Sequence, residues 1–275
     1  MLTLDVAIAT LGSDGIRRTA DMDLPPTEGV RYVVSWQTDD DHEPIPSALR
    51  RNDITVTWIR PSGVSDNRNN AFRHCNADIV LCADDDLSYT SSALRAVITS
   101  FEAYPGIDYA VFRYSGDEGA AIDNTKRYPD RERRISGRMR GFNVCTVEIA
   151  VRRSVIERGA GFDPRFGPGG EIACGEDEMF FLTLRKLGLR GRFFPITVAH
   201  HKGLSTGFRK ITEPRVAEGM GTVIGMTYPV SAILRIPLKA WRLQRHDRMA
   251  FPKALFHLYR GWLRHFPIIP LWKSL

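Results

Sequence analysis

The stretch ADIVLCADDDLSY, residues 77–89, places three consecutive aspartates directly after a run of apolar residues. Such a run is typical of a β-strand that is buried on both faces, as the inner strands of parallel sheets are. Three neighbouring carboxylates repel one another, so they lie either in water, as an acidic turn before a helix, or against a cation. The segment therefore predicts a buried strand that ends in a cluster of acidic side chains.

Similar β-type runs recur along the chain, at residues 4–10, 31–36, 53–59, 77–83, 108–114, 144–151 and 192–199. Between them, residues 65–75 and 91–101 place apolar side chains three and four positions apart, which is the spacing of a helix face. Strands that alternate with helices predict an α/β fold with a doubly wound, mostly parallel sheet. Ligands of such sheets bind beyond the carboxyl ends of the strands, where the aspartates stand.

Size and composition indicate an ordinary globular protein. With 275 residues and 43% hydrophobic residues, the chain is long enough for one large α/β domain or two small ones. The four cysteines show no CxxC spacing, so we interpret them as reduced thiols. The start, MLTLDVAIAT, lacks a basic region and is better interpreted as a first strand than as a signal peptide. We therefore expect a cytoplasmic protein without a membrane span.

The net charge of +6 is concentrated at the end of the chain, where residues 230–275 contain nine Lys or Arg and one acid. These basic residues alternate with Trp, Phe, Leu and Tyr, in pieces that we expect Pro237, Pro252 and Pro267 to interrupt. The composition is typical of helices that lie on an anionic membrane surface. The alternatives are a helical extension that packs on the rest of the chain or on a second subunit of a homo-oligomer, and a nucleic-acid-binding tail.

The aspartate cluster suits a metal site. In an extended backbone successive side chains point to opposite faces, so Asp84 and Asp86 can share one side while Asp85 points away. Two carboxylates suit Mg²⁺ or Mn²⁺, which fill their remaining positions with water and substrate phosphate. A substrate that carries a diphosphate follows from this chemistry.

Two further segments carry candidate groups. A glycine-rich loop ends in Gly175, Glu176 and Asp177, and a helical pattern follows, so Asp177 lies in the first turn of a helix. A carboxylate there could take a proton from a hydroxyl group, or could simply compensate the helix N-terminus. The last β-type run, residues 192–199, leads to His200 and His201. Strand alternation lets only one of them face the site, as a metal ligand or as a structural hydrogen-bonding group.

Taken in order, four segments resemble the family 2 glycosyltransferases of the GT-A fold. They are GVSDNRNNAFRHCNADIVLCADDD (63–86), GFDPRFG (161–167), GEDEMFFLTLRKLG (175–188) and PITVAHH (195–201). The resemblance covers roughly residues 3–207. It implies a GT-A catalytic domain over residues 1–215, followed by a basic, aromatic helical extension over residues 216–275.

On the donor side, the resemblance assigns Asp84 and Asp86 to the DxD motif, whose first carboxylate lies toward the ribose and whose last lies toward the metal. Asp85 lies between them and is included among the residues expected near the nucleotide sugar. His200 or His201 falls where some family members place a histidine on the metal.

On the acceptor side, Asp177 matches the aspartate of the family's ED motif, which acts as general base, and Glu176 matches the neighbour that helps to shape the acceptor site. Arg68, with Asn69, matches the arginine-bearing helix that lies beside the nucleotide.

The chain departs from the family after its first two strands. Many members have an aromatic-Asn pair where this chain has ATLGSDG, and a DDGS-type segment where it has VVSWQTDDD. Thr10, Gln37 and Asp39 are therefore candidates for base recognition by position alone.

The resemblance implies an inverting glycosyltransferase that uses Mn²⁺ or Mg²⁺ and a nucleotide-diphosphate sugar. Its acceptor would be a glycan or a lipid-linked glycan, in cell-surface polysaccharide synthesis at the inner face of the membrane. A single base distinguishes this site from that of a glycoside hydrolase, which uses two flanking carboxyls. The alternatives are a nucleotidyltransferase of similar fold, although no glycine-rich loop with Lys or Arg follows the first strand, and a non-enzymatic nucleic-acid-binding protein.

Overall fold

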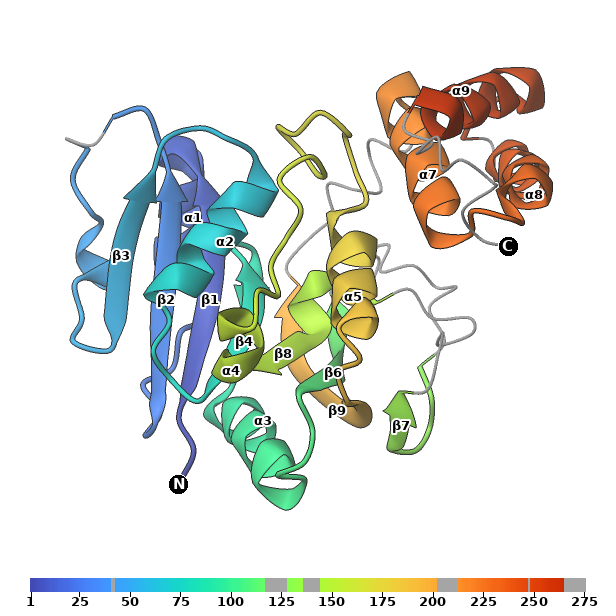
Figure 1. The fold of residues 1–275 in the computed structure, drawn as a ribbon. Coiled ribbons are helices and arrows are strands. Elements are labelled where there is room, and N and C mark those ends of the chain that lie inside the picture. Colours follow the sequence, from blue (N-terminus) through green and yellow to red (C-terminus); the bar gives the residue numbers. More distant parts are fainter. Residues whose placement is uncertain (41–42, 117–127, 136–143, 202–211, 247, 265–275) are drawn as a thin grey trace. The chain divides into compact units, whose positions relative to one another are not determined.

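The computed structural model describes residues 1–40, 43–116, 128–135, 144–201, 212–246 and 248–264 (Figure 1). The chain divides into two compact units. The first contains residues 1–164 and 176–205, and the second contains residues 165–175 and 206–275. The second unit therefore includes residues 165–175, which lie far from the end of the chain in sequence, in addition to the C-terminal extension that the sequence places at 216–275.

In the described residues of the first unit, nine strands form one sheet, with the strand order β3-β2-β1-β4-β8-β6-β9-β5 and with β7 paired to β9. The strands are β1 (Leu4–Leu11), β2 (Val30–Gln37), β3 (Ile54–Ile59), β4 (Ile79–Asp84), β5 (Leu87–Ser88), β6 (Tyr109–Gly116), β7 (Arg133–Ile135), β8 (Ile149–Arg152) and β9 (Gly191–His201). Strands β1, β2, β3, β4, β6 and β9 run in one direction, whereas β5, β7 and β8 run against it. The prediction of a mostly parallel α/β sheet is confirmed.

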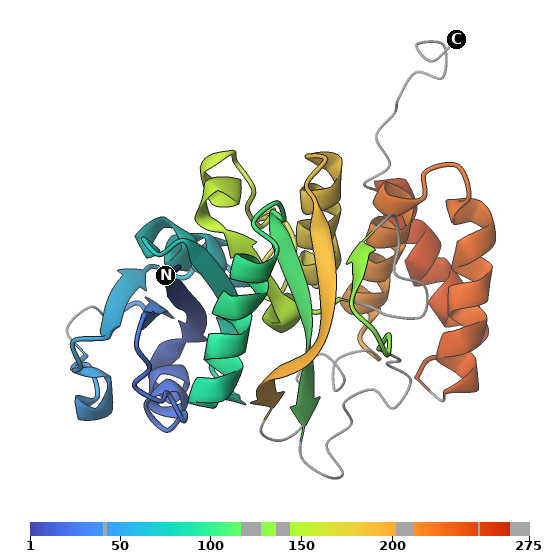
Figure 2. The same ribbon diagram turned by 90° about the horizontal axis from the view of Figure 1, so that it is seen from below.

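Helices cover both faces of this sheet. They are α1 (Gly12–Ala20), α2 (Val64–His74), α3 (Ser91–Ala103), α4 (Arg153–Glu157) and α5 (Glu176–Lys186). Ile16 of α1 and Leu94 of α3 belong to one buried apolar cluster, and Phe72 of α2 and Phe180 of α5 belong to another. Figure 2 shows α3 and α5 on opposite sides of the strands. The sheet is therefore doubly wound, as expected from its apolar strands.

One expected strand is shorter than predicted. Residues 144–151 were expected to form a strand throughout, but Thr146–Glu148 form a 3₁₀ turn and β8 begins at Ile149. The reason is Glu148, whose side chain is fully buried. Its carboxylate accepts hydrogen bonds from the Cys145 backbone N–H at 2.7 Å and from the Tyr128 hydroxyl at 2.5 Å. A buried carboxylate requires such partners, and the turn supplies one of them.

The described residues of the second unit form the helices α7 (Pro214–Thr227), α8 (Ala232–Arg245) and α9 (Phe251–Arg264). Helices α7 and α9 touch through glycine, because a Cβ on Gly221 or Gly261 would collide with the backbone of the opposite helix. The Thr222 hydroxyl donates to the Gly261 carbonyl at 3.0 Å and fixes this crossing. None of the helices in the described part of the chain is long and apolar enough to cross a bilayer.

The prolines of the extension do not interrupt it as expected. Pro237 lies inside α8, so the prediction of a break there is wrong. A proline in a helix leaves the carbonyl four residues earlier without its usual donor. Here that carbonyl belongs to Ile233, and the Tyr259 hydroxyl donates to it at 2.9 Å. Pro252 is the second residue of α9, where no backbone N–H is needed. Pro267 lies outside the described residues.

Candidate active site

The turn after β4 sends the three aspartates in different directions. Strand β4 ends at Asp84, so Asp85 and Asp86 do not continue the strand alternation that the sequence suggested. Asp84 faces α2, Asp85 faces α1, and Asp86 faces β9. Asp84 and Asp86 therefore contact different residues, Asp84 on α2 and Asp86 on β9.

Arg68 of α2 is the centre of the site. Its side chain is only 8% exposed, and its guanidinium lies 2.7 Å from Asp84, 3.4 Å from Asp177 and 3.9 Å from Glu176. Burial acts to lower the pKa of Arg68, but Asp84, Asp177 and Glu176 together outweigh it and raise that pKa. The guanidinium also lies 5.4 Å from the centre of the Phe162 ring. One permanent cation thus joins the carboxyl end of β4 to the first turn of α5.

Glu176 and Asp177 differ in their surroundings. Burial, followed by the charge of Asp177, raises the pKa of Glu176 to about 7, while Arg68 acts to lower it. Asp177 accepts a hydrogen bond on Oδ1 from the Thr146 hydroxyl, and Arg68 approaches the same oxygen. Among the described residues, the contacts of this carboxylate are therefore made at Oδ1, and they fix its orientation.

Thr146 was not anticipated from the sequence. It belongs to the 3₁₀ turn that the capping contacts of Glu148 form, inside a segment that was expected to be a regular strand. The available signal was a pair of polar residues, Thr146 and Glu148, at alternating positions in an otherwise apolar run. Their position beside Asp177 depends on a contact between segments that lie 31 residues apart.

Asparagines of α2 connect the site to its surroundings. The Asn69 side-chain amide pairs with the backbone of Phe162 through two hydrogen bonds of 2.8 Å. Asn69, which the resemblance placed beside the nucleotide, thus holds the loop that carries Phe162. Asn67, which was not anticipated, donates to the Thr10 carbonyl at 2.8 Å, and its buried Oδ1 has no hydrogen-bond partner in the described residues.

Asp85 is held by the first strand and helix. The Thr10 hydroxyl donates to Asp85 at 2.6 Å, and the Arg18 guanidinium lies 3.0 Å from the same carboxylate. Gly15 makes this contact possible, because a Cβ there would collide with the Thr10 hydroxyl and lie 3.0 Å from Asp85 Oδ2. The sequence indicated neither Gly15 nor Arg18.

The ends of β1 and β2 carry the candidates for base recognition. Thr10 pairs with Trp36 and Leu11 pairs with Gln37 in the parallel register, so the two strands end at the same edge of the sheet. The Gln37 side chain is buried, and its Oε1 has no hydrogen-bond partner within the described ranges. Asp39 is exposed two residues beyond the end of β2.

The two histidines have different neighbours. His201 Nε2 lies 3.1 Å from Asp86 Oδ2, whereas His200 Nδ1 lies 2.9 Å from the Ser115 hydroxyl. In the part of the chain that the structure describes, no three His, Cys, Asp or Glu residues form a metal-binding group. Asp86 Oδ1 is buried and has no hydrogen-bond partner among those residues. Asp86 and His201 therefore fit a cation that takes its other ligands from water and phosphate, as Mg²⁺ and Mn²⁺ do.

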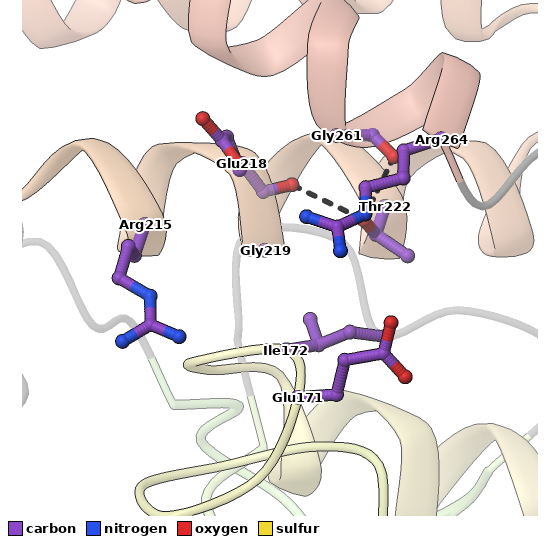
Figure 3. Close-up of a pocket in the computed structure, with 8 residues that line it drawn as sticks. All are labelled: Glu171, Ile172, Arg215, Glu218, Gly219, Thr222, Gly261 and Arg264. Carbon is purple, nitrogen blue, oxygen red and sulfur yellow. Dashed lines mark hydrogen bonds between the residues drawn. The ribbon is translucent and has the colours of Figure 1, made fainter.

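A separate small pocket of about 120 Å³ lies within the second unit (Figure 3). Its charged lining residues are Arg215, Arg264, Glu171 and Glu218. The Thr222 hydroxyl in its wall donates to the backbone of both α7 and α9, at 3.2 Å and 3.0 Å. Because cationic and acidic side chains are balanced, the pocket does not favour a phosphate or any other anion.

The chain is similar in sequence or fold to several known proteins. Residues 37–159 match the family model "Glycosyl transferase family 2". The structure is similar to S. aureus TarS 1-349 in complex with UDP-GlcNAc, with a TM-score of 0.61 and 13% identity over 96% of this chain and 91% of that chain. It is also similar to the mannosyltransferase PcManGT from Pyrobaculum calidifontis in complex with GDP-Man and Mn²⁺, with a TM-score of 0.55 and 18% identity over 99% and 77% of the two chains.

A further structure of TarS 1-349 has a TM-score of 0.57 and 15% identity over 81% of this chain, and this chain spans 64% of that 1-349 chain. No curated protein matches the chain. At these identities the solved structures show the fold, which is the expected GT-A type.

Proposed function

Because residues 37–159 match the family model "Glycosyl transferase family 2", we propose that the chain is a glycosyltransferase, which moves a sugar from a nucleoside diphosphate to an acceptor hydroxyl group with inversion at the anomeric carbon. The observation that carries the proposal is the buried guanidinium of Arg68, which lies 2.7 Å from Asp84 and 3.4 Å from Asp177. It brings the donor-binding carboxylate and the candidate base to one place, although they belong to segments far apart in sequence.

On the donor side, Asp84 faces the nucleotide, and Asp86 with His201 would hold Mn²⁺ or Mg²⁺. When bound, the cation neutralises the charge that builds on the departing diphosphate. The chain's own contribution is the Asp86 carboxylate. Its Oδ2 lies 3.1 Å from His201 Nε2, and its buried Oδ1 has no hydrogen-bond partner in the described residues. Support also comes from the similar mannosyltransferase, whose structure contains GDP-Man and Mn²⁺.

On the acceptor side, Asp177 takes the proton of the attacking hydroxyl group. Thr146 and Arg68 both contact Oδ1 and orient the carboxylate, so Oδ2 is the oxygen proposed to face the acceptor. Glu176 shapes the acceptor site beside it. A single base that acts from the face opposite the diphosphate gives inversion, and no second catalytic carboxylate is required.

The acceptor that we propose is a glycan or a lipid-linked glycan of a cell-surface polysaccharide, which the enzyme meets at the cytoplasmic face of the membrane. The support is the basic, aromatic extension, whose residues 230–275 contain nine Lys or Arg and one acid.

The experiment that tests the donor site measures the melting temperature with UDP, GDP, dTDP, CMP and their sugars, each with and without Mn²⁺. A ligand that binds only the folded state raises the apparent stability. We expect a rise for one nucleotide that depends on Mn²⁺ and is lost in Asp86→Ala. A nucleotide effect that is equal with and without metal, or is retained in Asp86→Ala, would contradict the proposed metal site.

The base is tested by sugar transfer in Asp177→Asn, with Glu178→Gln as the matched control in the same helical turn. We expect Asp177→Asn to keep the nucleotide-dependent rise in melting temperature and to lose transfer, while Glu178→Gln keeps both. Full transfer by Asp177→Asn would exclude its role as base. Release of pyrophosphate from a nucleoside triphosphate would instead favour the nucleotidyltransferase alternative.

A further inference from the structure

Helix α8 has an exposed apolar face opposite its buried one. Ile236, Ala240 and Leu243 belong to the core of the second unit. On the other side, Leu234, Leu238 and Trp241 follow the i, i+4, i+7 spacing and are 76%, 47% and 47% exposed. Large apolar side chains at this spacing form one continuous face, and a monomeric protein rarely leaves such a face in water.

Helix α9 repeats this arrangement. Its buried residues Ala254 and Leu258 pack in the same core, whereas Phe256 and Leu263 are 61% and 65% exposed. Phe256 and Leu263 line an open apolar hollow of about 830 Å³ along the helix. Both C-terminal helices therefore present apolar side chains on the surface of the second unit.

Basic side chains accompany both apolar faces. Exposed arginines and lysines of these helices are Arg235, Arg242, Arg245, Lys253, Arg260 and Arg264. Within residues 230–246 and 248–264, where the structure describes the chain, there is no aspartate or glutamate. The Arg245 guanidinium lies 5.2 Å from the centre of the Trp241 ring, so charge and apolar surface are in direct contact.

We propose that Leu234, Leu238, Trp241, Phe256 and Leu263 form an interfacial surface that docks on an anionic lipid bilayer. Charge complementarity identifies the occupant, because α8 and α9 combine exposed apolar groups with cations and contain no Asp or Glu of their own, although Arg260 lies 3.5 Å from Glu218 of α7. A second copy would place two cationic surfaces against each other. A nucleic acid would satisfy the arginines, but its phosphate backbone would leave Leu234 and Leu238 exposed to water.

This surface contains no residue of the proposed active site, so its test is independent of sugar transfer. The full chain is sedimented with vesicles of phosphatidylcholine alone and with vesicles of phosphatidylcholine and phosphatidylglycerol in equal parts. We expect binding to the anionic vesicles only. The variant Leu238→Ser/Trp241→Ser is expected to bind about tenfold more weakly. Arg242→Gln, which removes one cation, is expected to weaken binding about fivefold.

The matched control is Trp58→Ser, because Trp58 lies on β3 in the first unit and is 43% exposed, close to the value for Trp241. It is expected to bind as the wild type does. If the double variant does not fold, quenching by brominated phosphatidylglycerol in otherwise wild-type protein replaces it. We then expect Trp241→Phe to reduce the quenching and Trp58→Phe to leave it unchanged.

Three results would overturn the proposal. The first is equal sedimentation with both kinds of vesicle, or with neither. The second is a dimer in analytical ultracentrifugation that Leu238→Ser/Trp241→Ser dissociates, which would make a second copy the occupant. The third is salt-sensitive binding to duplex RNA or DNA that the same double variant abolishes while vesicle binding is absent.

Discussion

Glu176→Gln is expected to stabilise the protein at neutral and alkaline pH. Burial, followed by the charge of Asp177, raises the pKa of Glu176 from 4.5 to about 7, although Arg68 acts to lower it. Because the pKa of the folded state lies above that of the unfolded state, the stability from this group is complete below about pH 4.5 and is lost as the pH rises through about 7. The rise in pKa corresponds to a free energy of about 3 kcal/mol.

A glutamine cannot ionise and resembles the protonated glutamate in shape. The free energy of unfolding of Glu176→Gln is therefore expected to equal that of the wild type near pH 4 and to exceed it by up to about 3 kcal/mol near pH 8. The assay is urea unfolding at a series of pH values without nucleotide or metal. Glu178→Gln is the control, because Glu178 is exposed in the same helical turn. Its difference from the wild type is expected to change with pH less than that of Glu176→Gln, because the charge of Glu178 is the last of the causes that raise the pKa of Glu176.

A difference between Glu176→Gln and the wild type that does not change with pH would refute the reasoning. A variant that is less stable than the wild type above pH 7 would show that the attraction of Arg68 outweighs the cost of burial. The carboxyl carbon chemical shift of Glu176 gives an independent measurement, and its midpoint is expected near pH 7.

Three further substitutions test the packing around the site and in the extension. Gly15→Ala is expected to cost about 1 to 3 kcal/mol of unfolding free energy, because its methyl group displaces Thr10 from Asp85; an unchanged urea midpoint would contradict this. Gly261→Ala is expected to lower the free energy of unfolding by about 3 kcal/mol, because the added methyl group forces α9 away from α7. A helical signal that melts at the same temperature as in the wild type would exclude a close crossing of the two helices. Arg68→Met is expected to lower the free energy of unfolding by about 3 to 5 kcal/mol near pH 7 and by less near pH 5, where Glu176 beside it is protonated because burial and the charge of Asp177 raise its pKa to about 7. An equal loss at both pH values would count against the ion cluster.

The central part of the fold could be predicted from sequence because its signals are local. The apolar run that ends at Asp84 specifies a buried strand, and β4 occupies Ile79–Asp84. The parallel strands β1, β2 and β4 then end at one edge by geometry alone. The position of the aspartate cluster beyond the sheet therefore required no knowledge of distant contacts.

The details that the sequence did not determine depend on register and on distant partners. His201 lies beside Asp86 because it pairs with Leu87 in the antiparallel register of β5 and β9, and a shift of one residue would have presented His200 instead. Pro237 is accepted within α8 because the Tyr259 hydroxyl bonds to the carbonyl that the proline leaves without a donor. Neither partner is visible in the local sequence.

The shared guanidinium of Arg68 has a consequence for the evolutionary history of the chain. It contacts Asp84 and Asp177, which are 16 and 109 residues away in sequence. A change at position 68 alone would leave both carboxylates without their cation, and a change at either aspartate would unbalance the other contacts. Single substitutions at these three positions are therefore expected to be harmful and not neutral. In a family tree of related chains, they are expected to be inherited together or replaced together, within the same branch.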